Sequence, residues 1–379
     1  MDQSAPTKRA LRYRVDRLIR TLVMRVISSL ASDSQAQELD LRGHAVKRIL
    51  LVRPNFRIGS AVLALPALAA FHKKLSEARI DFVGSPISRL LLENQPLIEH
   101  FETPRRFPGV LWEYVLLFRR LRANRYDLAV DISCSQSGLS SFIIGLCGAR
   151  VRAGCAGKWD RVFNLKVAKF AEVNKYRKLT KFLTVLGLDD VDEVGSLKFS
   201  SAELSAGRAA IDSAVGKVAA PVIGVFVGGR KLRGKRWPIK NFVGVIDGLL
   251  RQRYAVVAFL GPEEADIASD LKRNLPPDAP IVCEPSLRKF AAMVSHLDLF
   301  VCCDSGPMHL ACTVGVQVLA IFRARDVARW APPAHAARIV CGADSVSAAE
   351  VLSAALEELS LRSEPPIMPS AGALAAGRP

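Results

Sequence analysis

The chain has 379 residues, half of them apolar, which is enough for two domains of ordinary size with substantial cores. Arg or Lys interrupts every apolar stretch, so we expect no membrane-spanning helix, and we see no signal peptide with an uncharged apolar segment. The formal net charge of +17 requires an anionic partner or surface. Phospholipid, anionic glycolipid or a nucleotide diphosphate fits this charge at least as well as nucleic acid. Because aromatic residues make up only 7% and no nucleic-acid-binding motif is evident, we expect no nucleic-acid partner.

The eight cysteines show no Cys-x-x-Cys pair and stand mostly within apolar strand or helix patterns. Such cysteines are typical of buried free thiols in a reducing compartment. We therefore expect a cytoplasmic protein.

Residues 1–45 form a predicted N-terminal extension with a basic amphipathic helix over residues 8–31. Its apolar residues recur at helical spacing, and its arginines lie mainly elsewhere around the helix: Leu11, Val15, Leu18, Leu22 and Val26 against Arg12, Arg14, Arg17, Arg20 and Arg25. One interpretation is an interfacial helix that contacts the anionic inner face of a membrane. The other is a helix that packs on the protein with a solvated basic face.

Residues 46–200 predict a first Rossmann-like domain, because strands alternate with helices along them. The apolar run 48–52 predicts a buried first strand, and a loop over 53–60 leads to a helix over 61–75. We expect further strands at 80–83 and 127–131, and further helices at 90–94, 110–123 and 139–146.

Residues 201–345 predict a second Rossmann-like domain in which the pattern starts again. After a helix over 200–219, we expect strands at 221–227, 256–260, 281–283, 299–302 and 318–322, with helices at 241–251 and 263–274. Two doubly wound halves predict a cleft between them, with the loops at the carboxyl ends of the strands facing it. A C-terminal helix over 346–362 and a disordered Pro/Ala/Gly tail over 363–379 complete the chain.

The stretch from Leu299 to Phe322 predicts a strand, a turn and a helix. The strand stops at Asp304-Ser305-Gly306-Pro307, and Pro307 suits the first turn of a helix that continues through Met308 and His309. A helix start at this edge of the sheet offers unpaired N–H groups and a positive dipole end to an anion. The same pattern is also common in α/β proteins that bind no phosphate there.

A basic loop, residues 228–238, follows the first strand of the second half. Its glycines let the backbone approach a phosphate, and Lys235 or Arg236 could neutralise it. A solvated basic loop is the alternative interpretation.

Together these segments resemble glycosyltransferase family 9, the heptosyltransferases of lipopolysaccharide core synthesis. The resemblance covers roughly residues 46–345. It rests on Ile49–Val52 with Gly59 and Leu65–Leu68, on Tyr126–Asp131, on Val225–Gly229 with Lys235–Pro238, on Gly261–Glu263, and on Asp304–Ala311.

The resemblance implies an α/β protein of the GT-B fold, that is, two doubly wound domains that face a cleft. It implies an inverting transfer of a heptose from ADP-heptose to a lipid A–core acceptor, without a metal or other cofactor. It places Lys235 on the diphosphate, Glu263 near the ribose, and the segment from Asp304 to His309 around the donor phosphates and sugar. The string Asp190-Val191-Asp192 is then a surface turn rather than a metal site.

The sequence departs from the family at Ser60, where the family usually has an Asp that is thought to act as general base. Serine cannot hold that proton at neutral pH, so three interpretations remain: Asp131 or another carboxylate takes over, the donor or acceptor differs, or the protein is a weakened or non-catalytic relative. A basic protein that binds membrane or nucleic acid is the alternative function. Arg323, where the family commonly has Gly, is a second departure that adds a positive charge near the donor loop.

Overall fold

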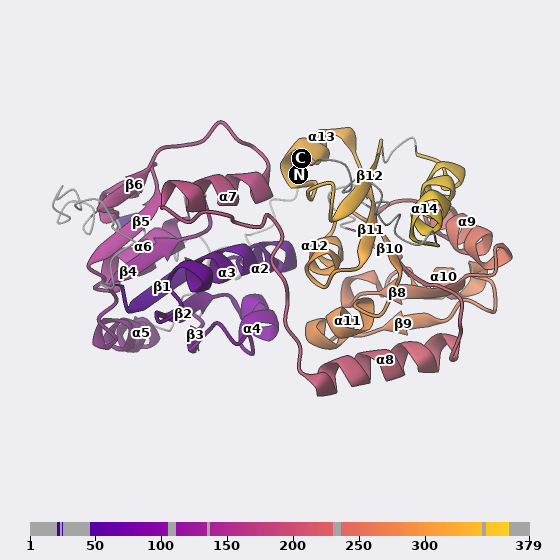
Figure 1. Cartoon of the computed structure of the whole chain (residues 1–379), viewed down its shortest axis with the longest axis horizontal. Coiled ribbons are helices and arrows are strands. Elements are labelled where there is room, and N and C mark those ends of the chain that lie inside the picture. The colour runs from indigo at the N-terminus through magenta and orange to yellow at the C-terminus, as the bar shows by residue number, and fades with distance from the viewer. Residues whose placement is uncertain are drawn as a thin grey trace, which may run out of the picture.

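The computed structural model describes residues 46–104, 111–134, 137–229, 236–342 and 346–363, together with 21, 22 and 25. Two lobes lie side by side (Figure 1), each built on a six-stranded parallel sheet. We call the lobe with the first sheet the first domain and the other the second domain. The strand orders are β3-β2-β1-β4-β5-β6 and, read from the far edge, β9-β8-β7-β10-β11-β12. Both are doubly wound in the same way, which confirms the predicted GT-B fold class.

The first sheet contains β1 (Arg48–Arg53), β2 (Arg79–Gly84), β3 (His100–Glu102), β4 (Leu128–Asp131), β5 (Val151–Cys155) and β6 (Leu165–Val167). Its helices are α2 (Ile58–Val62), α3 (Leu65–Lys74), α4 (Pro86–Leu92), α5 (Leu111–Ala123), α6 (Gly138–Leu146), the 3-10 turn η1 (Asp160–Val162) and α7 (Lys175–Val185).

The second sheet contains β7 (Val222–Phe226), β8 (Ala255–Leu260), β9 (Ile281–Cys283), β10 (Leu299–Cys303), β11 (Gln317–Phe322) and β12 (Ala337–Cys341). Its helices are α8 (Ser201–Val215), α9 (Ile239–Arg251), the 3-10 turn η3 (Pro262–Glu264), α10 (Ala268–Asn274), α11 (Leu287–Val294), α12 (Gly306–Thr313), α13 (Ala324–Trp330) and α14 (Ala348–Ser363). The C-terminal helix α14 packs against α9.

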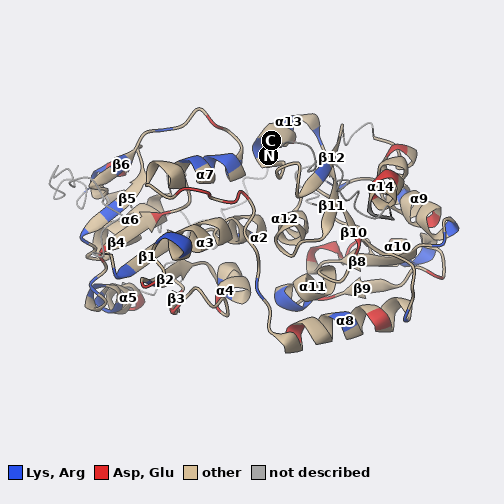
Figure 2. Cartoon of the chain, viewed as in Figure 1, with Lys and Arg blue, Asp and Glu red and all other residues tan. Residues whose placement is uncertain are grey.

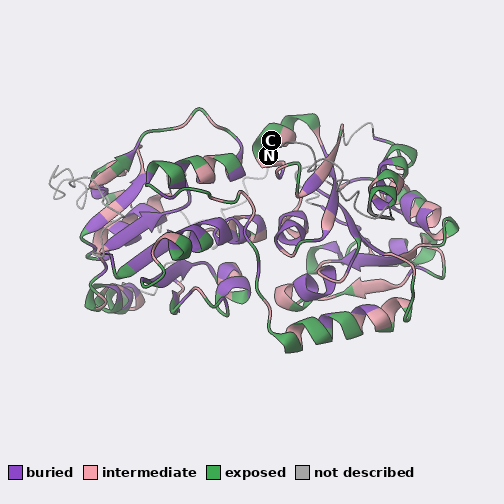
Figure 3. Cartoon of the chain, viewed as in Figure 1, coloured by how far each residue is buried: buried purple, intermediate pink, exposed green. Residues whose placement is uncertain are grey.

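The central strands are continuous apolar runs because helices cover both faces of each sheet. Every residue of β10 is buried, and Ile49 through Val52 of β1 have no exposed surface. Figure 3 shows this burial along both sheets. One cluster of buried apolar side chains includes Leu51 of β1, Met308 of α12 and Phe259 of β8, so it extends across the domain boundary.

Three predicted helices differ from those observed. The helix expected over 61–75 is two helices, α2 and α3, because Pro66 lacks an N–H and its ring would clash with the carbonyl group one turn earlier. The helix expected over 263–274 begins as η3 and resumes as α10, and the break accompanies the burial of Glu264. The helix expected at 90–94 starts earlier, at Pro86, because the side chain of Ser85 caps it by accepting from Ser88 N–H.

The thiol prediction holds in part: all eight cysteines are free, but Cys283 and Cys341 are exposed. No helix among the described residues is long and apolar enough to cross a membrane. Most of the predicted helix 8–31 and the tail after residue 363 lie outside the described residues.

Polar contacts of the segment between α7 and α8, and of α11, connect the two domains. The amide side chain of Gln95 forms two hydrogen bonds with the backbone of Lys198, and Leu197 N–H donates to Thr313 O at 2.9 Å. Arg288 of α11 donates to Leu91 O in the first domain at 2.9 Å and forms a bidentate ion pair with Glu203 of α8. The relative position of the two sheets is therefore fixed by specific polar contacts as well as by apolar packing.

Candidate functional site

A cleft of about 390 Å³ lies between the domains. The loop after β1 and the adjoining α2 form its wall in the first domain. The wall in the second domain includes the loops after β7, β8, β9 and β10, the starts of α11 and α12, and Trp330 at the end of α13. These are the carboxyl ends of the strands, where ligands bind in doubly wound sheets. The predicted loops from both halves therefore meet at one site.

Helix α12 directs its N-terminus into the cleft. Asp304, Ser305, Gly306 and Pro307 line it, whereas Met308 is fully buried in the core and does not. Ser305 is the N-cap residue, yet its hydroxyl caps no N–H group, and its buried Oγ has no hydrogen-bond partner among the described residues. A hydroxyl and the N–H groups of a helix start, beside the positive end of the helix dipole, suit a negatively charged ligand.

His309 lies in the first turn of α12, and its buried imidazole contacts the other domain. Its Nδ1 is 2.5 Å from the hydroxyl oxygen of Tyr176 on α7. The ring of Trp330 on α13 packs edge-on against the imidazole at 6.0 Å between centroids. His309 is therefore held by both domains at the floor of the cleft.

Two glycines allow α2 and α12 to approach each other closely. A Cβ atom on Gly59 would lie 2.5 Å from Cδ2 of His309, and one on Gly306 would lie 2.9 Å from Cβ of Ile58. Next to this contact, Ser60 lines the cleft, and its backbone carbonyl accepts from Nε of the buried Arg53 at 2.6 Å. The prediction that Ser60 stands at the cleft edge of the first domain agrees with this placement.

Asp131 lies behind the cleft and is not among its lining residues. Asp131 is 3% exposed, and its carboxylate accepts hydrogen bonds from the N–H and the hydroxyl of Ser133. Burial raises the pKa of Asp131 to about 6, although Ser133 and the nearby positive charge of Arg53 oppose the shift. A carboxylate in this position supports the ends of β1 and β4 rather than reaching a ligand.

Two adjacent carboxylates after β8 have different surroundings. Glu263, for which the resemblance implies a place near the ribose, is exposed and lines the cleft. Glu264 also lines it but is buried, and its Oε1 accepts from Gly229 N–H at 3.3 Å. Burial raises the pKa of Glu264. Sequence reasoning missed this residue, although Gly228 and Gly261, whose missing side chains leave room for its carboxylate, could have indicated it.

Of the two predicted phosphate-binding cations, Lys235 lies outside the described residues. Arg236 does not line the cleft: its guanidinium pairs with Asp266 at 2.9 Å and lies 3.9 Å from Glu264. Arg236 is therefore placed to hold the loop after β8. Arg323 also stays off the cleft, and its Nε and Nη2 both donate to Oδ2 of Asp326 on α13, so a carboxylate accompanies its charge.

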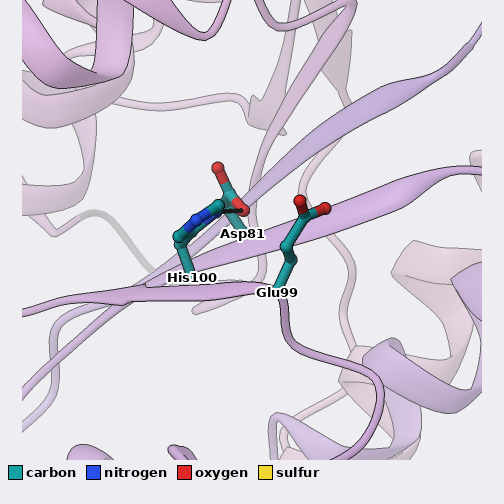
Figure 4. A group of neighbouring side chains, drawn as sticks. All are labelled: Asp81, Glu99 and His100. Atoms are coloured by element: carbon teal, nitrogen blue, oxygen red, sulfur yellow. Dashed lines mark hydrogen bonds and ion pairs between the residues drawn. The ribbon is translucent and has the colours of Figure 1, made fainter.

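Away from the cleft, Asp81 of β2, His100 of β3 and Glu99 just before β3 approach one another with atoms of the kind that bind metals (Figure 4). The two carboxylates already have partners. Asp81 accepts hydrogen bonds from His100, Tyr126 and Asn124, and Glu99 forms an ion pair with Arg79 at 3.0 Å. This group therefore stabilises the sheet. Asp190 of the Asp-Val-Asp string is 85% exposed, has φ 50° and pairs with Lys73 at 3.6 Å, as expected of a surface turn.

Positive charges from both domains gather beside the cleft. Figure 2 shows Lys and Arg on α7 and on α13, two helices that pack against each other. Asn174, the N-cap of α7, donates to Ala331 O just after α13 at 2.9 Å. Burial lowers the pKa of the Lys175 ammonium, and the charges of Arg329 and Lys178 lower it further.

Comparisons with known proteins agree with this geometry. The lipopolysaccharide heptosyltransferase 3 of Escherichia coli is 24% identical over 288 residues, which are 72% of this chain and 83% of that protein. A glycosyl transferase of family 9 from Veillonella parvula superposes with a TM-score of 0.74 at 20% identity, covering 86% of this chain and all of the other. The E. coli heptosyltransferase WaaC with ADP superposes with a TM-score of 0.66 at 16% identity, covering 82% and 99%. These two structures share the fold.

The family profile described as glycosyltransferase family 9 (heptosyltransferase) matches residues 115–358, which is more than half of the chain. That range includes the loops after β7 to β10 and the start of α12. The protein is therefore a glycosyltransferase that belongs to family 9.

Proposed function

We propose that this protein transfers a heptose from ADP-heptose to a sugar of the lipopolysaccharide core, with inversion and without a metal ion. One observation carries the proposal: the loop after β1 and the start of α12, which come from different domains, line the same cleft. A glycosyl transfer needs this arrangement, because the acceptor must approach the donor sugar from the side opposite the departing diphosphate.

The second domain is the proposed donor site. The N–H groups at the start of α12 and the hydroxyl of Ser305 would bind the diphosphate, while Glu263 would bind the ribose hydroxyls. Lys235, from the loop after β7, would supply the cation. When the bond between the anomeric carbon and the diphosphate oxygen breaks, the leaving ADP gains negative charge. A lysine and a helix N-terminus can stabilise that charge in place of a metal ion.

The first domain is the proposed acceptor site, and the lipid A–core acceptor is itself anionic. The positive charges of Lys175 and Lys178 on α7 and of Arg329 on α13 support such an acceptor. These charges repel one another, which lowers the pKa of Lys175, and a bound anion would relieve the repulsion. Because the acceptor is a membrane lipid, the enzyme would work in the cytoplasm at the inner face of the inner membrane. The basic helix 8–31 would bind that surface.

A weakened or non-catalytic family member is the second candidate function. The described cleft residues from the first domain are Phe56, Arg57, Ile58, Gly59, Ser60 and Ile87, and none of them is a carboxylate. Asp131, buried and engaged by Ser133, is poorly placed to substitute for the family Asp. Loss of a general base costs about 10²–10⁴-fold, so slow transfer remains compatible with Ser60.

The test is release of ADP from ADP-heptose in the presence of truncated lipopolysaccharide acceptors. Turnover that needs both substrates supports the proposal. Calorimetry with ADP on the wild type and on Lys235→Ala separates the alternatives. If Lys235→Ala binds ADP more weakly than the wild type and the wild type shows no turnover, the non-catalytic relative is favoured. If the wild type does not bind ADP, both candidate functions are contradicted.

A further inference from the structure

We propose that Tyr176 is a positioning residue that fixes the tautomer of His309 and does so across the domain boundary. Tyr176 belongs to α7 of the first domain, and His309 belongs to α12 of the second. The inference rests on the proposed function for its catalytic consequence. Its structural part stands on the contacts around the two side chains.

The direction of the hydrogen bond follows from burial. Tyr176 is 3% exposed and His309 is 5% exposed, and the hydroxyl oxygen of Tyr176 is 2.5 Å from Nδ1 of His309. In the part of the chain that the structure describes, the Tyr176 hydroxyl forms its side-chain hydrogen bond with this nitrogen. A buried O–H without an acceptor costs about 1–3 kcal/mol, so the phenol donates and Nδ1 accepts.

The tautomer follows from that direction. A neutral imidazole carries one proton, and a lone pair on Nδ1 leaves that proton on Nε2. Burial also raises the pKa of Tyr176 well above its ordinary value, which keeps the phenol protonated and able to donate. The partner of one ring nitrogen thus decides the protonation of the other.

The surrounding residues prevent the ring from turning over. Tyr176 and Trp330 pack against the imidazole with ring centroids 5.7 Å and 6.0 Å away. The absence of a side chain on Gly59 leaves a space that Cδ2 of His309 fills. A ring flip would bring a carbon atom to the Tyr176 hydroxyl and break the hydrogen bond. His309 therefore has one orientation and one tautomer when the domains are arranged as in this structure.

The consequence is a defined chemical role. A neutral imidazole with its proton on Nε2 is a hydrogen-bond donor, and it cannot accept a proton from an acceptor hydroxyl through that nitrogen. His309 lines the cleft beside the start of α12. We assign it the role of donating to the anionic part of the nucleotide sugar as the diphosphate departs, which is a contact that strengthens with charge in the transition state. Tyr176 supplies this donor only when the two domains meet.

The test compares Tyr176→Phe with Tyr126→Phe. Tyr126 is equally buried, and its hydroxyl donates to Asp81 at 2.5 Å outside the cleft, so the control removes the same group from the same domain. We expect kcat for heptose transfer to fall about 10- to 100-fold in Tyr176→Phe, with ADP-heptose affinity within about threefold of wild type. Tyr126→Phe should keep the wild-type kcat. Equal kcat in Tyr176→Phe and wild type would overturn the proposal.

Nitrogen NMR of histidine-labelled protein gives a readout that needs no turnover. The His309 signals are assigned by their loss in His309→Gln. We expect wild type and Tyr126→Phe to carry the proton on Nε2, and Tyr176→Phe to show a mixture of tautomers. A proton on Nδ1 in the wild type would overturn the inference. If the wild type shows the expected spectra but no transferase activity, the proposed function is contradicted and the assigned tautomer is retained.

Discussion

At the scale of single residues, Ser60 stands where the resemblance to family 9 implies an Asp. Ser60 lines the cleft on the first-domain side. If the protein is a weakened transferase, Ser60→Asp should raise kcat for ADP release from ADP-heptose, by up to about 10²–10⁴-fold, because a carboxylate can accept the proton of the acceptor hydroxyl. Ser60→Asn, similar in size but unable to act as a base, is the control. Equal activities of the Asp and Asn variants would argue that another group already removes the proton.

Asp131 leads to a prediction about pH and stability. Burial raises its pKa from 3.8 to about 6, so between these values the folded protein holds a proton that the unfolded chain has released. The stabilisation is complete below the pKa of the unfolded chain and is lost as the pH rises through the pKa of the folded protein. Asparagine does not titrate. The free energy of unfolding of Asp131→Asn, relative to wild type, should therefore rise by about 2 kcal/mol between about pH 4.5 and 7.5.

Urea unfolding at the two pH values measures this difference. Asp189→Asn, at a carboxylate that is 71% exposed, serves as the surface control. A difference between Asp131→Asn and wild type that is the same at both pH values would contradict the prediction.

Some residues of the candidate site could be predicted from the sequence, and others could not. The turn from Asp304 to Pro307 could be placed in the cleft because a strand end and a helix start have local signals. Glu264 and the pairing of Arg236 with Asp266 depend on which way a short turn rotates its side chains, and neighbouring carboxylates in a sequence do not reveal this. Tyr176 and His309 are 133 positions apart, so their contact follows from the arrangement of the two domains.

At the scale of elements, the contact between α2 and α12 depends on the absence of side chains at two glycines. Gly59→Ala would place a methyl group 2.5 Å from the imidazole of His309. We expect it to lower the free energy of unfolding by about 1–3 kcal/mol and to reduce transferase activity, because α2 must move away from α12. Gly138→Ala on α6 is the control, since its methyl group would meet Trp159 at an ordinary 3.7 Å. Thermal unfolding and ADP release check both variants.

The long apolar strands were predicted from the sequence, whereas the edge strands β3 and β6 and the basic helix α7 were not. The strands at β1, β7, β8, β10 and β11 were expected close to their observed bounds because buried parallel strands are continuous apolar runs. The edge strands β3 and β6 have only three residues each and owe their form to a neighbouring strand. Helix α7 was missed although Asn174 caps it, since its exposed lysines and arginines obscure the apolar side that holds Leu179 and Phe182.

At the scale of the whole molecule, the net charge of +17 predicts salt-sensitive binding to an anionic surface. If helix 8–31 contacts the membrane, the full-length protein should sediment with anionic vesicles at low salt and stay in the supernatant at higher salt. Leu18→Glu combined with Leu22→Glu should weaken this binding, because both substitutions charge the apolar side of the predicted helix. Leu361→Glu, at an exposed apolar residue of α14, is the control. Unchanged retention of the double variant would assign membrane binding to another surface.

The apolar cluster shared by the two sheets has a consequence for how the molecule melts. Domains with separate cores usually unfold in separate steps. Here side chains of β1, α12 and β8 belong to one buried cluster, and Arg288 and Gln95 add polar contacts across the boundary. Neither lobe can unfold without exposing part of the other's interior, so a calorimetric scan should show a single cooperative endotherm. In Gly59→Ala, where α2 and α12 are forced apart, that endotherm should split into two.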